Sequence, residues 1–519
     1  MKFKSKSKPK ARGVTGPQSH LPDGHLVDVQ HKLMQALACH QQGQWAQAKS
    51  GYEQVLATHP LHFDALHMLG VLATQTQHAE QAVGLIQQAI RINPGVAGAH
   101  VNLGVALRQL GQLEQALASY DLALHLEPQD AQTHTNRGVA LRSLHRHSEA
   151  LESYNTALQL APQMAEARYN RGLVLNDLNL LEDAVQDFDA TLALRPSYHP
   201  ALWAKALCLL QLGEFAQAWT LYPLRWQQDE KEFTSQTLLT SVAKWQPGAL
   251  ASRLLVWPEQ GVGDELMFGA LLPQAQQLCQ HLLVQMDARL IPMFQRGMPG
   301  IGFVPKHQKV DEAMYDAHLP MGDLAQLFCQ EEKSFQAIQP AYVKADTARV
   351  EKLRQEINPD GKHLVGISWR SKNLKKGQDR SLPLPDMLRA LNMPGVRFVN
   401  LQYGDVAVEL AQAHVELGME VVQCPSVDNQ HDLDGLAALI QACDLVVSAD
   451  NSTVHLAGAL GQAVWVLLPF NADWRWLLGR DDSLWYPSAK LFRQENIGDW
   501  QSLLARVSAE LKQRPYATP

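Results

Sequence analysis

The sequence predicts two architectures in one chain: an α-solenoid, followed by a pair of α/β domains with parallel sheets. A 34-residue period runs through the first half, and after about residue 250 short apolar strands alternate with helices. A polar stretch then separates two groups of such strands, and 519 residues with 46% apolar content allow several cores. We place a disordered basic tail at 1–28, the solenoid at 29–235, and the α/β domains at 250–345 and 360–515.

Composition and charge exclude several classes of protein. A formal net charge of −7 argues against a general nucleic-acid binder. The clustered cations from Lys2 to Arg12 lack the apolar core of a signal peptide, and no segment approaches the ~20 apolar residues that span a bilayer. The six cysteines lack Cys-x-x-Cys spacing, which favours buried thiols over zinc. We expect a cytoplasmic protein without a nucleic-acid partner, a membrane span or a metal.

The first half of the chain repeats every 34 residues. Prolines keep this step from Pro60 to Pro196, and glycines keep it from Gly70 to Gly172. Alanines and aromatic residues share the frame: Ala48, Ala82, Ala116, Ala150 and Ala184, with Tyr52, Tyr120, Tyr154 and Phe188. The glycine lets two helices approach closely, the ring packs between helices, and the proline ends the second helix. The pattern looks like a tetratricopeptide repeat array of about six units, the regular ones at about 63–96, 97–130, 131–164 and 165–198.

An asparagine recurs on the first helix of three units, the helix that lines the concave face of such an array. These residues are Asn102, Asn136 and Asn170. An amide both donates and accepts hydrogen bonds, so a row of amides could hold a peptide backbone without selecting side chains. The alternative is three solvated polar residues that happen to recur. The row resembles the asparagine ladder of the eukaryotic O-GlcNAc transferase superhelix, which implies a protein or peptide partner.

Short apolar runs predict two parallel sheets after residue 250. The candidate strands are 253–257, 281–286 and 302–305 in the first domain, and 364–369, 396–402, 445–448 and 464–468 in the second. The polar stretch 336–360, with Pro340 and Pro359, fits a link between the domains. Such a pair is typical of GT-B-type glycosyltransferases and of two-domain dehydrogenases. Because no Gly-x-Gly-x-x-Gly follows the first strand, the dinucleotide interpretation is the weaker one.

The first predicted strand runs into a glycine-rich turn. Gly261 and Gly263 let the backbone turn sharply there, which leaves Asp264 at the start of the next helix. Because ligands bind at the carboxyl edge of parallel sheets, this carboxylate suits a general base for an acceptor hydroxyl. The alternative is that Asp264 only caps its helix.

A βαβ unit around residue 450 supplies a second candidate site. The apolar run 445–448 leads into a polar turn, and small apolar residues follow at helical spacing as far as Gly461. A helix N-terminus at this place offers N–H groups and a positive dipole end to phosphate. Candidate donor-binding residues are Asp450, Asn451, Ser452, Thr453 and His455, with Ser452 and Thr453 as good N-caps. In the alternative, Asp450 and Ser452 only cap the helix and His455 belongs to the core.

A basic loop follows the first strand of the second domain. It holds Arg370, Ser371, Arg380 and Ser381, with Lys372, Lys375 and Lys376. In a transferase without a metal, cations and helix ends must neutralise the leaving diphosphate, and this loop could do so. Gln402, which ends the next strand, is a candidate contact for a base or ribose. The alternative for the lysines is a solvated loop.

Packing and capping explain two further patterns. The cluster Asp473-Trp474-Arg475-Trp476 is expected to place its tryptophans in the core or between domains. The Asp-x-Asp triplets at 187–189 and 432–434 could suggest a metal, but the first lies within a repeat helix and the second precedes a helix. We therefore predict no metal site.

A family resemblance follows from these motifs. Gly261-Val262-Gly263-Asp264, with the run from Asp450 to Ala457, resembles the heptosyltransferase-type (glycosyltransferase family 9-type) bacterial GT-B enzymes over about 252–515. The whole chain resembles bacterial proteins that fuse tetratricopeptide repeats to such a domain. The resemblance implies inverting, metal-free transfer from a nucleotide-diphosphate sugar, with Asp264 as base and the 450–455 turn on the donor. Ser452 departs from the usual glycine of the family, and lipopolysaccharide heptosyltransferases lack the repeats.

Three functions are compatible with the sequence. The first is a glycosyltransferase whose repeats recruit a protein and whose acceptor is a Ser or Thr hydroxyl. The second is a heptosyltransferase-like enzyme that acts on envelope glycan or lipopolysaccharide. The third is a non-catalytic repeat scaffold with a degenerate transferase domain. The first is favoured because Asp264, Arg380, Asp450 and His455 are all present.

Overall fold

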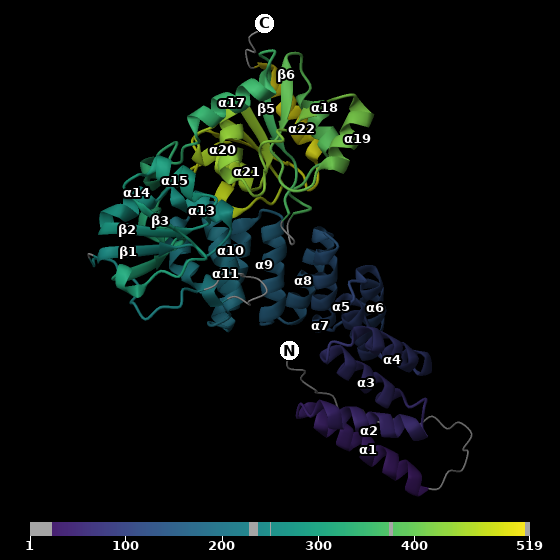
Figure 1. Cartoon of the computed structure of the whole chain (residues 1–519). Coiled ribbons are helices and arrows are strands. Elements are labelled where there is room, and N and C mark those ends of the chain that lie inside the picture. The colour runs from purple at the N-terminus through teal and green to yellow at the C-terminus, as the bar shows by residue number, and fades with distance from the viewer. Residues whose placement is uncertain (1–22, 228–236, 250, 373–376, 514–519) are drawn as a thin grey trace. The chain divides into compact units, whose positions relative to one another are not determined.

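The computed structural model describes residues 23–227, 237–249, 251–372 and 377–513 (Figure 1). Residues 1–22, Lys375, Lys376 and the predicted domain ends at 235, 250 and 515 lie outside these ranges. Contacts divide the chain into two compact units, Met1–Asn170 and Arg171–Pro519. The second unit therefore holds the last repeats together with both sheets.

The first unit consists of helix pairs. Their bounds are α1 (Asp23–Gln41) with α2 (Trp45–Thr58), α3 (Phe63–Gln75) with α4 (Ala79–Ile92), α5 (Ala97–Gln109) with α6 (Leu113–Leu126), and α7 (Ala131–Ser143) with α8 (His147–Leu160). Helix α1 corrects the predicted tail, because residues 23–28 belong to this helix. Helix α9 (Ala165–Asp177) starts the next pair. From α3 onward each first helix begins at the predicted start of its unit, and the tetratricopeptide prediction is confirmed.

The repeated glycine lies against the repeated aromatic ring, as predicted. A Cβ on Gly104, Gly138 or Gly172 would lie 2.5, 2.6 or 2.7 Å from a ring carbon of Tyr120, Tyr154 or Phe188. All three rings are fully buried. Any larger side chain at these positions would therefore push the two helices of the pair apart.

The second unit begins with the end of the repeat array. Helices α10 (Leu181–Leu194), α11 (His199–Leu212) and α12 (Phe215–Leu221) lead into a 3₁₀ turn at Tyr222–Gln227. The turn between paired helices has a positive φ at one repeat position, at Gln77, Gly111, His145, Asn179 and Gly213. Asn179 thus occupies a left-handed position that asparagine tolerates better than most residues.

The first sheet is parallel, with strand order β3-β2-β1-β4. Its strands are β1 (Ala251–Trp257), β2 (Cys279–Met286), β3 (Gly302–Pro305) and β4 (Ala317–Pro320). Its helices are α13 (Val262–Gly269), α14 (Leu272–Ala275), α15 (Ile291–Gly297) and α16 (Asp323–Phe328), with 3₁₀ turns at Gln276–Leu278, Glu312–Met314 and Glu332–Ala337. The register pairs Leu255 of β1 with Leu283 of β2 and His318 of β4.

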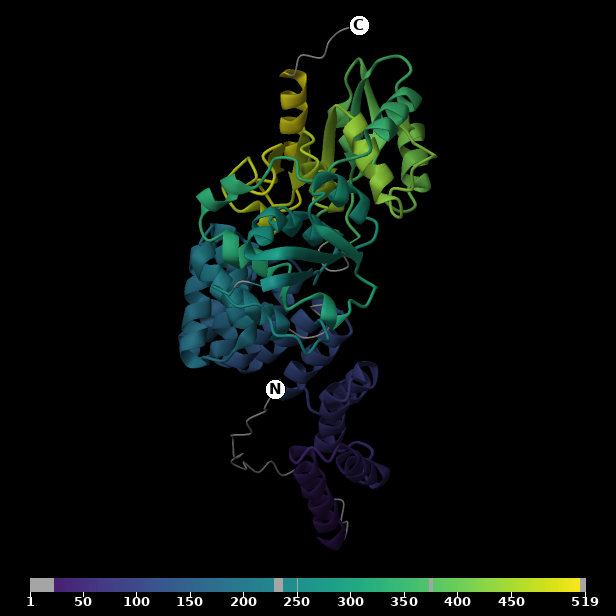
Figure 2. The same cartoon turned by 60° about the vertical axis from the view of Figure 1, so that its left-hand side comes forward.

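The second sheet is also parallel, with strand order β10-β9-β8-β5-β6-β7. Its strands are β5 (His363–Ser368), β6 (Val396–Asn400), β7 (Val421–Val422), β8 (Leu445–Ala449), β9 (Val464–Leu468) and β10 (Ala489–Arg493). Helices α18 (Leu384–Leu391), α19 (Ala407–Leu417) and α22 (Trp500–Gln513) share a core with one face of it. Helices α17 (Thr347–Ile357), α20 (Leu433–Ala442) and α21 (Ser452–Ala459) belong to the core on the other face. Figure 2 shows the yellow helix α22 beside the strands of this sheet.

The seven predicted strands form within two residues of their predicted bounds, but three strands were not predicted. These are β4, β7 and β10, each at the edge of its sheet or only two residues long. Edge strands are short and polar because one side faces solvent, so the apolar-run criterion misses them.

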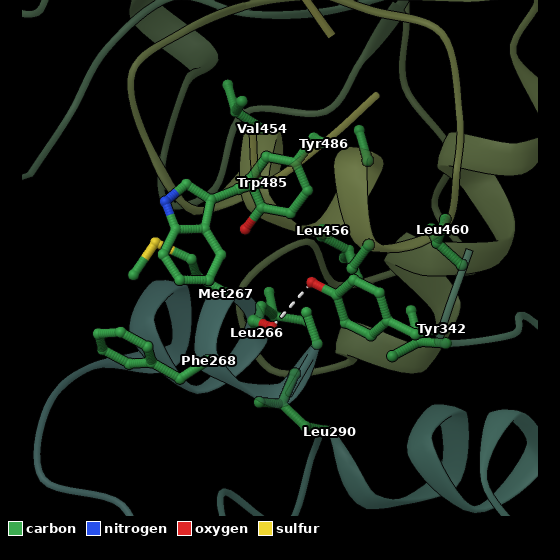
Figure 3. Close-up of a cluster of buried hydrophobic side chains, with 14 of the residues drawn as sticks. Leu266, Met267, Phe268, Leu290, Tyr342, Val454, Leu456, Leu460, Trp485 and Tyr486 are labelled. Atoms are coloured by element: carbon green, nitrogen blue, oxygen red, sulfur yellow. Dashed lines mark hydrogen bonds between the residues drawn. The ribbon is translucent and has the colours of Figure 1, made fainter. Parts of the chain in front are cut away.

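The predicted link at 336–360 is an ordered seam and not an open linker. It contains α17, whose N-cap Asp346 accepts from the Arg349 N–H at 3.0 Å. Tyr342 is buried there and donates to the Leu266 carbonyl at 2.8 Å, while its own N–H donates to Ala459 at 3.1 Å (Figure 3). Figure 3 shows Leu266 and Phe268 of α13 facing Val454 and Leu456 of α21. The two sheets are therefore joined through the helices that begin at their carboxyl edges.

The glycine–ring contact of the repeats can be tested within one helix. We expect Gly104→Ala to lower the free energy of unfolding by about 1–3 kcal/mol, because Tyr120 cannot move away. Gly98→Ala in the same helix should raise it by about 0.5 kcal/mol, since nothing lies within 4 Å of a Cβ there. Calorimetry of both variants measures this, and equal effects would contradict the packing argument.

Candidate functional site

Hydrogen bonds from two side-chain amides connect the ends of β5, β6 and β8. Gln402 Oε1 accepts from Ser368 Oγ at 3.0 Å and from the N–H groups of Trp369 and Arg370, each at 2.9 Å. Asn451 Nδ2 donates to Ser368 Oγ at 2.8 Å and to the Arg370 carbonyl at 3.0 Å. Gln402 and Asn451 were both predicted to contact the donor. Their side-chain amides instead hydrogen-bond to groups at the carboxyl edge of the sheet.

Asn451 also caps α21. Its Oδ1 accepts from the Thr453 N–H at 2.9 Å, so the cap lies one residue before the predicted Ser452 and Thr453. Ser452 opens the helix instead. Thr453 Oγ1 is buried and has no hydrogen-bond partner among the described residues. A hydroxyl in this position offers a donor to an oxygen placed at the helix N-terminus.

A chain of alternating charges crosses from the second sheet to the first. Asp450 Oδ2 lies 3.1 Å from Arg380, and Arg380 lies 3.2 Å from Asp473 Oδ2. Asp473 Oδ1 lies 2.6 Å from Arg475, which also pairs with Asp264 Oδ1. Predicted Asp264, Arg380 and Asp450 therefore come together, linked by two residues that were not predicted to serve the site.

The missed residues follow β9 in the predicted aromatic cluster. Trp474 and Trp476 are buried, as predicted, and Trp476 Nε1 donates to Asp450 Oδ1 at 3.0 Å. The guanidinium of Arg475 lies 4.7 Å above the Trp474 ring. The alternation of charged and aromatic residues from 473 to 476 is the sequence signal that could have identified Asp473 and Arg475.

Arg380 and Arg475 both have raised pKa values and therefore stay protonated. Burial alone would lower the pKa of Arg475, but the charges of Asp264 and Asp473 outweigh it and raise that pKa well above its ordinary value. Burial likewise opposes the charge of Arg380, and Asp450 and Asp473 raise its pKa. Two permanent cations therefore lie near the N-terminus of α21.

The first sheet presents Asp264 by the predicted glycine-rich turn. Gly261 is the N-cap of α13 in an extended conformation, so the capping alternative for Asp264 is wrong. A Cβ on Gly263 would lie 3.0 Å from His455 Cδ2, so any larger residue would require the imidazole to shift by a few tenths of an ångström. Asp264 is partly exposed, and its carboxylate faces the second sheet.

His455 lies in the core behind this contact. Its Nδ1 is 2.9 Å from the Tyr486 hydroxyl, and its ring stacks on Trp476 at 5.6 Å. Burial lowers the pKa of His455 below 6.5. The imidazole is therefore neutral at pH 7 and supports the site by packing, which is the core interpretation of this residue.

The remaining residues of the basic loop contact groups outside the charge chain. Arg370 lies 2.8 Å from Glu409 and is not part of the charge chain, while Ser381 Oγ accepts from the Ser371 N–H at 3.0 Å. Lys372 lies 3.4 Å from Gln430, which lines a cavity of about 410 Å³ at the ends of β6 and β7. Its other lining residues include Asn400, Gln402, Asp405, Asp428 and Asn429.

The predicted asparagine row keeps its spacing on α5, α7 and α9. Asn102 Nδ2 lies 2.8 Å from His67 Nε2, and Asn136 Oδ1 accepts from Gln132 at 3.5 Å. Asn136 is only 8% exposed, and Asn170 is half-buried. Met68 and Ala204 take the same position in the flanking repeats, so the row ends there.

A buried charge cluster fixes the other end of the glycine-rich turn. Arg225, which follows the last repeat helix, is fully buried and lies 2.7 Å from Glu259 and 2.6 Å from Asp323. Its guanidinium is 4.4 Å from the Tyr222 ring and 4.7 Å from the Trp226 ring. Burial raises the pKa of Glu259 to about 7, although Arg225 opposes this shift. No sequence pattern identified Arg225, since its partners lie far along the chain.

The Asp-x-Asp triplets have the predicted structural roles. Asp432 caps α20 by accepting from the Gly435 N–H at 2.8 Å, and Asp187 and Asp189 pair with Arg171 and Lys205. Over the residues described, no three His, Cys, Asp or Glu side chains gather as a metal site requires. Within the same ranges, no helix has the length and apolar content needed to cross a bilayer.

Comparison with known families identifies the repeats. Tetratricopeptide repeat models match residues 33–97, 135–199, 177–222 and 85–118, and a TPR repeat model matches 106–144. Protein FlbA of Caulobacter vibrioides is 31% identical over 334 residues, which cover 60% of this chain and 54% of FlbA. The chain thus spans about half the length of this relative.

The chain also has limited similarity to solved structures. PilF of Pseudomonas aeruginosa shares 18% identity with a TM-score of 0.36, covering 41% of this chain and 96% of that chain. YrrB, described as a TPR protein with an unusual peptide-binding site, shares 22% with a TM-score of 0.31, covering 34% and 91%. MamA of Desulfovibrio magneticus shares 16% with a TM-score of 0.31, covering 33% and 96%. The N-terminal part is a tetratricopeptide array, a fold typical of protein interaction, and a Rossmann-like α/β region follows it.

The neutral state of His455 makes stability depend on pH. An unfolded histidine binds a proton near pH 6.5 but the folded one resists it, so stability present above pH 6.5 is lost as the pH falls below that value. His455→Asn keeps a polar atom for Tyr486 and removes this titration. We expect the variant to lose less stability than the parent between pH 7.5 and 5, as measured by thermal unfolding.

Exposed His414 provides the matched control. His414→Asn should follow the pH profile of the parent protein. An unchanged profile in His455→Asn would contradict the neutral buried state.

Arg225 should dominate the stability of its region. Arg225→Leu leaves the buried Glu259 without a cation and Asp323 with only the exposed Lys244, and we expect a loss of about 3–5 kcal/mol. Arg389→Leu, which breaks the exposed pair with Asp386, should cost no more than about 1 kcal/mol. Denaturant unfolding compares the two variants, and similar losses would show that the buried cluster contributes little.

Proposed function

We propose that the protein is a metal-independent, inverting GT-B-type glycosyltransferase that moves a sugar from a nucleotide-diphosphate sugar to a protein Ser or Thr hydroxyl. One observation carries the proposal. Asp264, at the carboxyl edge of one parallel sheet, pairs with Arg475. Through Asp473 this arginine is linked to Arg380, which pairs with Asp450 at the carboxyl edge of the second sheet, beside a helix N-terminus. Carboxyl edges of parallel sheets are where α/β proteins bind nucleotides.

The second sheet offers what a diphosphate needs. Arg380 and Arg475 supply fixed positive charge, and the N-terminus of α21 adds the buried Thr453 hydroxyl. The cavity near Lys372 has room for a nucleoside at about 410 Å³, within the usual range for small-molecule sites. In this arrangement the nucleotide occupies the cavity and the diphosphate reaches toward the arginines.

Asp264 is the proposed base. Its Oδ1 accepts from Arg475, and the Gln260 amide donates to Oδ2 at 2.9 Å. A carboxylate oxygen has two lone pairs, so Oδ2 can also accept the proton of an acceptor hydroxyl. As that proton leaves, the hydroxyl oxygen attacks the anomeric carbon and the sugar–phosphate bond breaks on the opposite face. The cations and helix end then stabilise the departing nucleoside diphosphate, the role a metal ion has in other transferases.

The repeats support a protein acceptor. Tetratricopeptide arrays are interaction surfaces, and Asn102, Asn136 and Asn170 keep one repeat position. An envelope glycan acceptor gains nothing from such an array. A non-catalytic scaffold uses the same repeats, and it is the outcome that remains if the α/β region binds no nucleotide.

Calorimetric titration with a panel of nucleoside diphosphates, without added metal, tests the proposal. We expect Arg380→Gln and Arg475→Gln each to weaken binding about 10- to 100-fold, the effect of losing one charge-assisted hydrogen bond. Asp264→Asn should keep binding and lose about 100- to 10,000-fold in transfer rate.

Arg389→Gln is the control and should bind as the parent does, because exposed Arg389 pairs with Asp386 and Glu416 and with no member of the charge chain. Failure of the parent protein to bind any nucleoside diphosphate would overturn the proposal and leave a peptide-binding scaffold.

A further inference from the structure

The last repeats are hydrogen-bonded to the loop that contains Arg475. Asn179, in the turn between α9 and α10, donates from Nδ2 to the Phe470 carbonyl at 2.7 Å. Asn471 donates in return from Nδ2 to the Asn176 carbonyl at 2.8 Å, near the end of α9. We call these two bonds the clasp, because each joins a side-chain amide of one segment to a backbone carbonyl of the other.

Helix α11 holds the other end of the same loop. The Leu478 N–H donates to the Gln211 carbonyl at 3.1 Å, and Gln211 Nε2 donates to the Ala472 carbonyl at 3.4 Å. Trp219 of α12 meets the Trp474 ring edge-on at 5.8 Å. The loop from Phe470 to Leu478 is thus fixed at both ends and in the middle by the repeats.

The loop is held in a strained conformation. Leu477 has φ 51° and ψ −173°, a region that residues with a Cβ avoid. Leu477 is buried, and a Cβ on Gly213 of the repeats would lie 3.5 Å from its side chain. Such a conformation persists only where surrounding contacts over-determine it, and here the repeats supply many of those contacts.

We propose that Asn179 and Asn471 are positioning residues, which hold the 470–478 loop so that Arg475 faces both Asp264 and the donor diphosphate. The inference rests on the proposed function. Asp473 and Arg475 lie between the clasp and the strained residue, so a shift of the loop moves both charges. In this proposal the end of the repeat array supports the transfer site by positioning the 470–478 loop, in addition to recruiting an acceptor.

The experiment measures nucleoside diphosphate affinity of the full chain by calorimetry. Asn179→Asp and Asn471→Asp keep the side-chain shape but cannot donate, so the double variant loses the clasp. We expect about tenfold weaker binding of the nucleoside diphosphate, which corresponds to the free energy of roughly one hydrogen bond. Gln77→Glu makes the corresponding change of amide to carboxylate at the equivalent exposed turn of an earlier repeat and should have no effect.

A merely structural role is separated by a double-mutant cycle. In an Arg475→Gln background the clasp substitutions should cost nothing further, because the group that they position is gone. Additive losses would overturn the inference. If the double variant does not fold, Asn179→Gly removes only one amide and keeps the left-handed turn.

The outcomes distinguish the two proposals. If the parent protein binds a nucleoside diphosphate and the clasp variants bind it with unchanged affinity, the positioning role is overturned and the proposed function stands. A parent protein that binds no nucleoside diphosphate overturns both.

Discussion

The contact between Asp264 and Arg475 is the constraint on which the rest of the site depends. It joins two sheets through one ion pair, and it ends a chain in which three carboxylates alternate with two guanidiniums. Alternation places each charge of the chain next to an opposite charge, which offsets the cost of its partial removal from water. The apolar side chains of α13 and α21 pack together beside this contact (Figure 3).

This balance shapes how an anion can bind. Both arginines already have carboxylate partners, so the site is not a preformed pocket of unpaired positive charge. A diphosphate must share the guanidinium N–H groups with Asp264, Asp450 and Asp473, and each guanidinium has five donors to share. Donor binding and the environment of Asp264 are then coupled through Arg475, which contacts both in the proposed arrangement.

Sequence reasoning found the parts of the site that belong to strand-end motifs. Asp450 follows β8 directly, and Asp264 follows β1 after one glycine-rich turn, so the local sequence places both at the sheet edges. Arg475 and Asp473 escaped prediction because their positions depend on a loop that folds back against the repeats, a contact between residues far apart in sequence. The assignments of Gln402 and Asn451 named the right place, yet their amides meet backbone groups that the strand ends leave unsatisfied.

The same reasoning explains why the repeats and the α/β region share one compact unit. A solenoid end exposes an apolar face unless a polar capping helix covers it. Here Leu210, Phe215, Trp219 and Tyr222 of the last repeat belong to the hydrophobic core that also contains β1, α13 and α21. The α/β region is therefore the cap of the solenoid. Because one core serves both parts, the last repeat cannot move independently of the 470–478 loop, and the geometry around Arg475 depends on that repeat as well as on the sheets.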